Sequence, residues 1–360
     1  MEAVTDVVFR HVIAEAGRPD VFFTEFTNAI GWFRAGDKAI GGRLIKTDEE
    51  GPIVAQLWGS DPEAMVALSK HCVKLGYDGI DINMGCPDQS AIKGGGGAHM
   101  IRTPERAYEM IAAAKQSGLP VSVKTRLGYT YVDEWREWLG GLLRQDIAVL
   151  TIHLRTKKEM SKVPAHFELI ADIKKLRDEI APDTLLVING DVRDRAHGLE
   201  FYQKHGVDGV MIGRGVFANP FCFVDGKGEL VGGRWELVDG RLNGSETSLA
   251  TKHLQPEKFN DVSSKNFPRE DVSTEEMVSV KPFSNDSVDA SDTKREELIS
   301  LLQFHLDEYD KYSAQTGRPF ETLKRFFKIY IRDFEGASDL RDQLMHCKTT
   351  AGVRNILSQL

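Results

Sequence analysis

The chain has 360 residues, of which 41% are hydrophobic and 28% charged, and its net charge is −8 at pH 7. This length suits one barrel domain of roughly 250 residues and a smaller domain. The sequence has no apolar run of about 18 residues, and its start lacks the basic and apolar regions of a signal peptide. We therefore expect no membrane span and a cytoplasmic location.

The acidic residues are unevenly distributed. Residues 225–292 contain 8 Lys and Arg against 14 Asp and Glu, which leaves a net charge of only −2 for the rest. We interpret this segment as an acidic, largely flexible insertion or linker, with one predicted hairpin formed by 229–231 and 235–238. It separates a predicted barrel domain at 1–224 from a predicted helical domain at 293–360. Basic patches outside it can still bind phosphates.

Short apolar runs alternate with helical patterns along the first 224 residues, as is typical of strands buried on both faces of a parallel sheet. We predict strands at 21–25, 53–57, 79–84, 121–124, 148–153, 185–188 and 209–212, with helices at 62–75, 104–116, 132–144, 166–179 and 194–204. Eight strands would close a barrel, and residues 4–10 look like the loop and helix that follow a strand. We therefore predict an α/β fold, a (β/α)8 TIM barrel with a truncated first strand. An open doubly wound sheet is the alternative, but its glycine fingerprint is missing.

Cys86 lies in a Gly-Cys-Pro turn at the end of a predicted strand, three residues after Asn83. Four glycines follow at 94–97, where a backbone without Cβ atoms could approach a flat ligand closely. A thiol held at the carboxyl end of a barrel strand is a candidate acid or nucleophile. The alternative is a small residue that only fits a tight turn. Because the four cysteines are widely spaced, we predict reduced thiols and no metal site.

Other polar residues end the remaining strands. They are Gln56, Lys124 with Arg126, His153 with Arg155, Asn189-Gly190-Asp191 and Gly213-Arg214-Gly215. The last two loops suit a phosphate group, which such barrels often bind there. A lysine in an apolar strand is costly to bury without an anionic partner, and a ligand could supply one. Lys124 could instead pair with a barrel carboxylate, and His153 could be a core histidine.

Helical patterns return after Thr293 and predict a small bundle of three or four helices. Its first helix would bury one face, which is formed by Leu298, Leu301, Leu302 and His305. In a second helix, over 322–332, Arg325, Lys328 and Arg332 recur at helical spacing. This basic stripe could follow the phosphates of a nucleic acid, although an ordinary solvated helix face would look the same.

The chain resembles the tRNA-dihydrouridine synthases, a family of flavin enzymes with a barrel and a helical domain. The matching stretches are 1–6 with Phe9-Arg10, Thr24-Glu25, Gln56-Leu57, 81–87, 95–98, 124–128, 153–156, 189–191 and 208–215. The most specific of them is Asn83-Met84-Gly85-Cys86-Pro87.

The resemblance implies an FMN site at the barrel mouth. It places Met1, Glu2, Gln56, Lys124 and His153 around the ring and ribityl chain, and Asn189, Gly190, Asp191, Gly213 and Arg214 at the phosphate. NADPH or NADH would reduce the flavin. Hydride would then reach C6 of a uracil in tRNA, and Cys86 would protonate C5.

The resemblance also concerns the substrate. It places Asn83 and Arg126 beside the uracil, and Arg325, Lys328 and Arg332 on the tRNA. We expect a monomer. Two alternatives remain: a flavin reductase of a small molecule, similar to dihydroorotate dehydrogenase or the ene-reductases, and an RNA-binding relative without activity. The basic helical segment disfavours the first, and the presence of Cys86, Lys124 and Arg214 disfavours the second.

Overall fold

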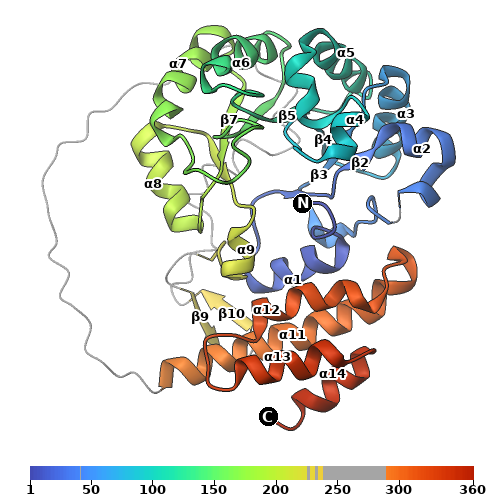
Figure 1. Ribbon diagram of the computed structural model, residues 1–360, viewed down its shortest axis with the longest axis vertical. Coiled ribbons are helices and arrows are strands. Elements are labelled where there is room, and N and C mark those ends of the chain that lie inside the picture. Colours follow the sequence, from blue (N-terminus) through green and yellow to red (C-terminus); the bar gives the residue numbers. More distant parts are fainter. Residues whose placement is uncertain (41, 225–227, 232–233, 238–288) are drawn as a thin grey trace, which may run out of the picture.

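The computed structural model describes residues 1–40, 42–224, 228–231, 234–237 and 289–360, with side chains up to residue 224 and from residue 294. Figure 1 shows two parts of the molecule, an α/β part and a group of C-terminal helices, with the first helix between them. The predicted hairpin is confirmed as an antiparallel pair, β9 (Gly228–Val231) and β10 (Arg234–Leu237). Most of the predicted acidic linker lies outside the described residues.

Eight parallel strands form the main sheet. They are β1 (Phe22–Phe23), β2 (Thr27–Asn28), β3 (Ile53–Trp58), β4 (Gly79–Asn83), β5 (Val121–Arg126), β6 (Val149–His153), β7 (Leu185–Asn189) and β8 (Gly209–Met211). Both β1 and β2 pair with β3, so they fill one strand position, and the order then runs from β3 to β8 in sequence.

All seven predicted strands are therefore present, and the predicted barrel architecture is confirmed. The first predicted strand is interrupted between β1 and β2, where residues 24–26 leave the ladder. Within the described part of the chain, no strand joins β8 to β1, so the sheet is not closed by strand pairing at that point.

The strand register brings the polar strand ends together. Asn83 on β4 pairs with Lys124 on β5, and His153 on β6 pairs with Asn189 on β7. Arg126 lies opposite His153. Since all these strands are parallel, their carboxyl ends meet at one edge of the sheet, which we call the barrel mouth.

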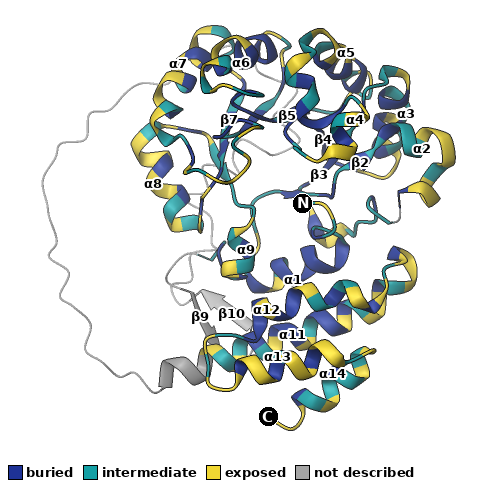
Figure 2. Ribbon diagram, in the orientation of Figure 1, coloured by how far each residue is buried: buried dark blue, intermediate teal, exposed yellow. Residues whose placement is uncertain are grey.

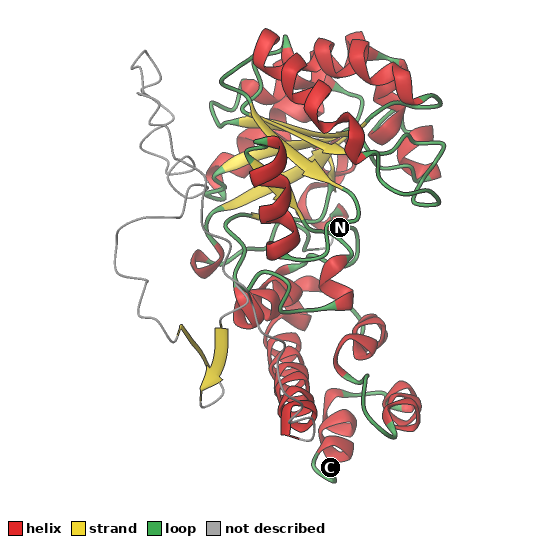
Figure 3. Cartoon of the chain, turned by 90° about the vertical axis from the view of Figure 1, so that its left-hand side faces the viewer, coloured by secondary structure: helices red, strands yellow, loops and turns green. Residues whose placement is uncertain are grey.

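Helices alternate with the strands along the chain, and several of them cover the outer side of the sheet (Figure 3). They are α1 (Val7–Gly17), α2 (Ala29–Ala35), α3 (Pro62–Lys74), α4 (Gln89–Lys93), α5 (Pro104–Lys115), α6 (Trp135–Leu143), α7 (Ile170–Ile180), α8 (Arg195–His205) and α9 (Gly215–Ala218). Several begin at an aspartate whose carboxylate accepts backbone N–H groups of the first turn, as Asp61 does for α3. Pro62 then takes the first helical position, where its missing N–H costs nothing.

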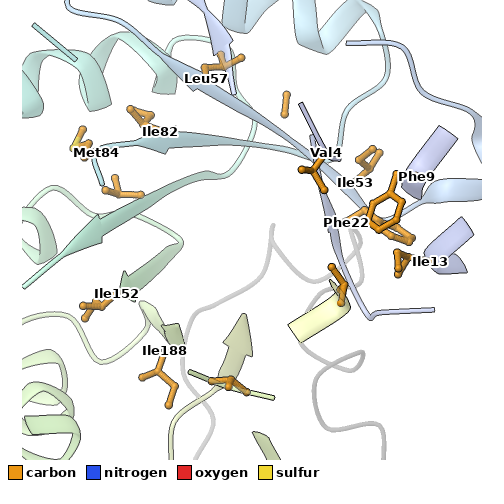
Figure 4. Close-up of a cluster of buried hydrophobic side chains, with 14 of the residues drawn as sticks. Val4, Phe9, Ile13, Phe22, Ile53, Leu57, Ile82, Met84, Ile152 and Ile188 are labelled. Atoms are coloured by element: carbon orange, nitrogen blue, oxygen red, sulfur yellow. The ribbon is translucent and has the colours of Figure 1, made fainter. Parts of the chain in front are cut away.

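The core lies between the strands and these helices. Figure 2 shows the strands as buried and the outward faces of the helices as exposed. Apolar side chains of several strands, among them Leu57, Ile82 and Ile152, are at most 1% exposed (Figure 4). Burial on this scale stabilises the sheet and holds the mouth residues on a rigid base.

The C-terminal part contains α11 (Asp289–Thr316), α13 (Ala337–His346) and α14 (Thr350–Leu357), with the short 3-10 helix Phe320–Phe326 and α12 (Phe327–Tyr330) between them. The predicted bundle is confirmed, and its expected apolar face on α11 is buried. The prediction of one regular helix over 322–332 is wrong. In that segment residues 322–326 belong to the 3-10 helix, and α12 follows and ends at Tyr330.

Helix α1 connects the two parts. The Phe9 ring stacks on Phe326 with 4.6 Å between ring centroids. Arg318 forms ion pairs with Asp6, at 3.2 Å, and with the buried Glu25. The described residues include no helix that is both long and apolar enough to cross a membrane.

Candidate functional site at the barrel mouth

The Cys86 turn is held from both sides. The side-chain Oδ1 of Asn83 accepts the N–H of Gly85 at 3.1 Å and that of Cys86 at 2.9 Å. The carbonyl of Cys86 accepts the N–H of Ala98 at 2.9 Å. A Cβ added at Gly97 would lie 2.7 Å from that carbonyl, and Gly97 has a φ of +56°. Only glycine fits there without strain, so the glycine segment supports the turn.

Burial is the main reason that the pKa of the Cys86 thiol is raised, while the N–H of Asp88 and the charge of Arg126 act in the opposite direction. The thiol is therefore protonated at neutral pH. Cys86 is only partly buried, so solvent or substrate can reach its turn. These properties suit a proton donor better than a resting nucleophile, which would need a lowered pKa.

A chain of side-chain amides fixes the orientation of Asn83. Its Nδ2 donates to Oε1 of Gln56 at 3.1 Å, and Nε2 of Gln56 donates to Asp81 at 2.7 Å. Asp81 is fully buried and also accepts the hydroxyl of Ser122 at 2.6 Å. Because a carboxylate only accepts hydrogen bonds, Asp81 sets which end of each amide faces the next. Asp81 and Ser122 were not predicted as site residues. A carboxylate inside an otherwise apolar strand is a sequence signal that could have indicated a role for Asp81.

Lys124 points to the middle of the mouth. Its ammonium donates to Oδ1 of Asn189 at 3.2 Å, and Nδ2 of Asn189 donates to the carbonyl of Met211 at 2.7 Å. Burial, with a smaller effect of Arg126, lowers the pKa of Lys124 to about 8. No carboxylate in the described part of the chain comes within ion-pair distance of this ammonium. The predicted alternative of a Lys124 ion pair is thus absent from the described residues.

His153 is neutral in this setting. Burial lowers its pKa to about 2, with further effects of nearby cations that include Arg126 and Lys124. Its Nε2 lies 3.1 Å from Nη1 of Arg155. A Cβ on Gly190, whose φ is +113°, would come within 3.0 Å of the imidazole. The imidazole and the loop after β7 therefore lie against each other.

Asp191 links the loops after β6 and β7. It forms an ion pair with the buried Arg155 and accepts the N–H of Ala165 at 3.0 Å. Arg214 is exposed, and its Nη2 lies 3.5 Å from Oδ1 of Asp191. The Asp191 carboxylate is thus committed to arginines, whereas the Arg214 guanidinium remains open to solvent.

The residues predicted at the first loop lie beside this site. A Cβ added at Gly213 would meet Sδ of Met1 at 3.9 Å, which places Met1 against the loop after β8. The Glu2 carboxylate is taken up by an ion pair with Arg43 at 2.5 Å. The Glu2 side chain therefore already has a cationic partner.

Arg126 is 5% exposed and holds loops together. Its guanidinium donates to the carbonyls of Gly85 at 2.8 Å, Thr156 at 3.1 Å and Met160 at 2.9 Å. These contacts join the Cys86 turn to the loop after β6. The predicted contact of Arg126 with substrate stays a prediction, and its observed contacts are those of a positioning residue.

The basic stripe of the helical part contacts the barrel rather than pointing only to solvent. Arg325 donates to the carbonyl of Ala3 at 2.8 Å, and Arg332 donates to the carbonyls of Phe217 and Ala218. The Lys328 ammonium lies 5.9 Å from the centre of the Phe217 ring. The stripe therefore borders the first and last loops of the mouth.

The comparisons with known proteins show the family of the chain. The family model for dihydrouridine synthase matches residues 1–236. "Probable tRNA-dihydrouridine synthase 2" of Bacillus subtilis (strain 168) is 49% identical over 99% of this chain and 91% of that protein. "Probable tRNA-dihydrouridine synthase" of Staphylococcus epidermidis (strain RP62A) is 46% identical over 99% of this chain and 90% of that protein. The counterpart of Staphylococcus aureus (strain Mu50) is 46% identical over 100% and 90%, respectively.

Among solved structures, morphinone reductase in complex with tetrahydroNAD matches 61% of this chain and 81% of that chain. The identity is 13% and the TM-score 0.42, a likeness too low to support a conclusion. The family model matches more than half of the chain, and the three relatives are at least 46% identical to it over nearly its whole length. The chain belongs to the dihydrouridine synthase family.

Proposed function

We propose that this protein is a tRNA-dihydrouridine synthase that uses FMN and a nicotinamide reductant to reduce the C5–C6 double bond of a uridine in tRNA. The relatives that cover the chain almost end to end carry this activity in their names. The observation that carries the proposal is the Cys86 turn, which Asn83 holds at the carboxyl end of β4. That is where a barrel enzyme keeps its reacting groups.

The residues of the mouth fit FMN. Lys124 is a partly buried cation whose hydrogen-bond acceptor is a neutral amide, and an electron-rich ligand would compensate its charge. Gln56 already has its orientation fixed by Asp81 and could face the ring edge. The phosphate would lie at Asn189, Gly190, Asp191, Gly213 and Arg214. Because Asp191 is held by Arg155, its negative charge is compensated before a phosphate arrives.

His153 can only act as a neutral donor or acceptor, because its pKa is far below physiological pH. Together with backbone at Met1 and Glu2, it would border the ring and ribityl chain. FMN, once reduced by NADPH or NADH, would supply the hydride that adds to C6 of the uracil.

The protein itself supplies the proton and the geometry. Sγ of Cys86 would donate its proton to C5 of the uracil, leaving a thiolate. Arg126 lies near enough to favour that thiolate electrostatically, and solvent can return the proton. Asn83 holds the turn, so the thiol stays where the uracil must lie flat. A uridine in folded tRNA has to leave its stack to reach this position.

The proposed partner is tRNA. The protein would act as a monomer and bind the tRNA with the barrel mouth and the helical part together. Arg325, Lys328 and Arg332 would face its phosphates from the rim of the mouth, since they also contact barrel loops there. We keep the division into a barrel domain (1–224), a linker (225–292) and a helical domain (293–360) as part of this proposal.

The test uses the full chain loaded with FMN, an unmodified tRNA transcript and NADPH. Nucleosides from the RNA are analysed by mass spectrometry, with reactions lacking NADPH or protein as controls. A uridine that gains two hydrogens only in the complete reaction supports the proposal. Oxidation of NADPH with bound FMN but without dihydrouridine would instead indicate a reductase of a small molecule.

A further inference from the structure

A second group of basic and aromatic residues lies at the mouth, away from the helical part. It contains Arg102, Tyr129, Tyr131, Lys157 and Lys158, and we call it the rim cluster. These residues follow β4, β5 and β6, three neighbouring strands whose carboxyl ends border Cys86. None of them is assigned to the FMN site or to the thiol chemistry described above.

Two cations of the rim cluster share one aromatic ring. The Arg102 guanidinium lies 5.0 Å and the Lys157 ammonium 5.1 Å from the centre of the Tyr129 ring. The Lys158 ammonium lies 5.8 Å from the centre of the Tyr131 ring. Among the described residues, no carboxylate lies within ion-pair distance of these three cations. Each of these three cations therefore lacks a carboxylate partner there, and an anionic ligand could supply the opposite charge.

Two of the nearby carboxylates already have hydrogen-bond or ion-pair partners. Glu134 accepts the backbone N–H groups of Tyr129, Thr130 and Tyr131. Glu159 is paired with His166 at 2.9 Å and accepts the N–H of Thr156. Residues 155–162 contain four basic residues and one acidic residue in a chain whose net charge is −8. The rim cluster is therefore a local positive surface on an acidic protein.

The rim cluster is rigidly connected to the Cys86 turn. The N–H groups of Lys157 and Lys158 donate to the carbonyls of Gly128 and Tyr129, at 2.8 and 2.9 Å. Arg126 ties the same loop to the carbonyl of Gly85. Arg102 ends the 3-10 helix Gly97–Arg102, which begins against Cys86. The distance between cluster and thiol is thus set by hydrogen bonds and not by a loose loop.

Tyr131 is 66% exposed although it is a large aromatic residue. Glu134 accepts three backbone N–H groups of this loop, including that of Tyr131, and so fixes the backbone that carries the exposed ring. Exposed aromatics interleaved with lysine and arginine are the pattern by which proteins hold single-stranded nucleic acid, with rings that stack on bases and cations on phosphates.

We propose that the rim cluster binds the RNA strand next to the uridine that enters the mouth. Lys157, Lys158 and Arg102 contact its phosphates, and Tyr131 stacks on an unpaired base. This inference rests on the proposed function, because RNA is the substrate there. It adds a contact surface on the barrel to the one that the stripe of Arg325, Lys328 and Arg332 provides on the helical part.

The first experiment measures the affinity of the FMN-loaded full chain for an unmodified tRNA transcript at several salt concentrations. The double variant Lys157→Ala/Lys158→Ala is compared with Lys70→Ala/Lys74→Ala, which removes two exposed lysines from α3. Loss of two phosphate contacts is expected to weaken binding about tenfold or more at low salt and to reduce the slope of log K against log salt by about 1.4 to 2. The control is expected to bind as the wild type does.

The stacking contact has its own test. Tyr131→Ala is expected to bind the transcript about fivefold or more weakly with an unchanged salt slope, whereas Tyr131→Phe keeps most of the affinity. Equal FMN content and equal thermal unfolding of all variants show that the fold is intact.

The nicotinamide reductant also carries phosphates, so it must be tested separately. The rate at which NADPH reduces the bound flavin without RNA is expected to be unchanged in Lys157→Ala/Lys158→Ala. If that rate falls and RNA binding does not, the cluster binds the reductant and the inference is wrong. The inference is also wrong if the wild type makes dihydrouridine but Lys157→Ala/Lys158→Ala binds RNA as tightly as the wild type does. A wild type that binds RNA through these residues but makes no dihydrouridine contradicts only the proposed function.

Discussion

Oδ1 of Asn83 accepts the backbone N–H of Cys86 at 2.9 Å, so the residue that ends β4 also fixes the turn that carries the thiol. The same oxygen accepts the N–H of Gly85, which is buried, whereas Cys86 is partly buried. The strand therefore positions the proposed acid directly, without a flexible segment between them.

Replacement of Asn83 tests this relationship. Asn83→Ala leaves two N–H groups without their acceptor, which costs about 1–3 kcal/mol each where they are buried. We expect turnover with tRNA to fall about tenfold or more, because small displacements of a reacting group are costly. Asn83→Asp keeps both acceptor bonds but exchanges the donor to Gln56 for a negatively charged acceptor, so it should lose some activity and still retain more than Asn83→Ala. Equal losses in both variants would contradict the positioning role.

Gly97 offers a test of the opposite side of the turn. In Gly97→Ala the new Cβ would lie 2.7 Å from the Cys86 carbonyl, so the turn must move. We expect dihydrouridine formation to fall about tenfold or more. Gly118 is the control, since it also has a positive φ, of +81°, but open space around a Cβ. Gly118→Ala should therefore lower stability slightly and leave activity unchanged, and similar activities of the two variants would argue against the close contact.

The pKa of Lys124, lowered by burial to about 8, predicts a pH dependence of FMN binding. The ammonium is charged below that pKa and loses its charge as pH rises through it. If the bound form keeps the proton, affinity of the apoprotein for FMN should fall about tenfold between pH 7 and pH 9. Lys124→Met should bind FMN more weakly at pH 7 and lack this decrease. Titration of flavin fluorescence measures both, and an equal decrease in the variant would exclude Lys124 as its origin.

Arg318 couples the helical part to the barrel. It pairs with Glu25, which is buried and accepts the N–H of Val4 in the first loop. Burial raises the pKa of Glu25, and Arg318 opposes that shift. Removal of one partner from a buried pair costs about 3–5 kcal/mol, whereas apolar or neutral replacement of both is far milder.

We therefore expect Arg318→Met to lower the thermal unfolding temperature strongly. The double variant Arg318→Met/Glu25→Gln should recover much of the loss. Additive losses in the double variant would show that the pair does not couple the two parts.

Much of this architecture was readable from the sequence, because its patterns are local. Each predicted strand is a continuous apolar run, and each polar residue that ends a run, such as Lys124 or Asn189, reaches the mouth through the parallel register. The tertiary contacts were not readable. Arg126 looked like a substrate ligand, but three backbone carbonyls from two distant loops surround its guanidinium.

The same limit explains the other differences. Helical spacing predicted one regular helix over 322–332, yet a 3-10 helix of about three residues per turn occupies 322–326 and α12 ends at Tyr330. The rim cluster could not be predicted from the sequence because its members come from three separate loops. Only the fold brings Arg102 and Lys157 to the Tyr129 ring.

The central claim is that Sγ of Cys86 gives the proton to C5 of the uracil. The most direct measurement is a single turnover of the protein with its FMN reduced in advance, mixed with unmodified tRNA, in the wild type, Cys86→Ser and Cys86→Ala. The account predicts tight FMN and RNA binding in all three and dihydrouridine formation that is strongly slowed in Cys86→Ala and in Cys86→Ser, whose hydroxyl is a weaker acid. Formation at the wild-type rate in Cys86→Ala, with the same RNA bound, would contradict it.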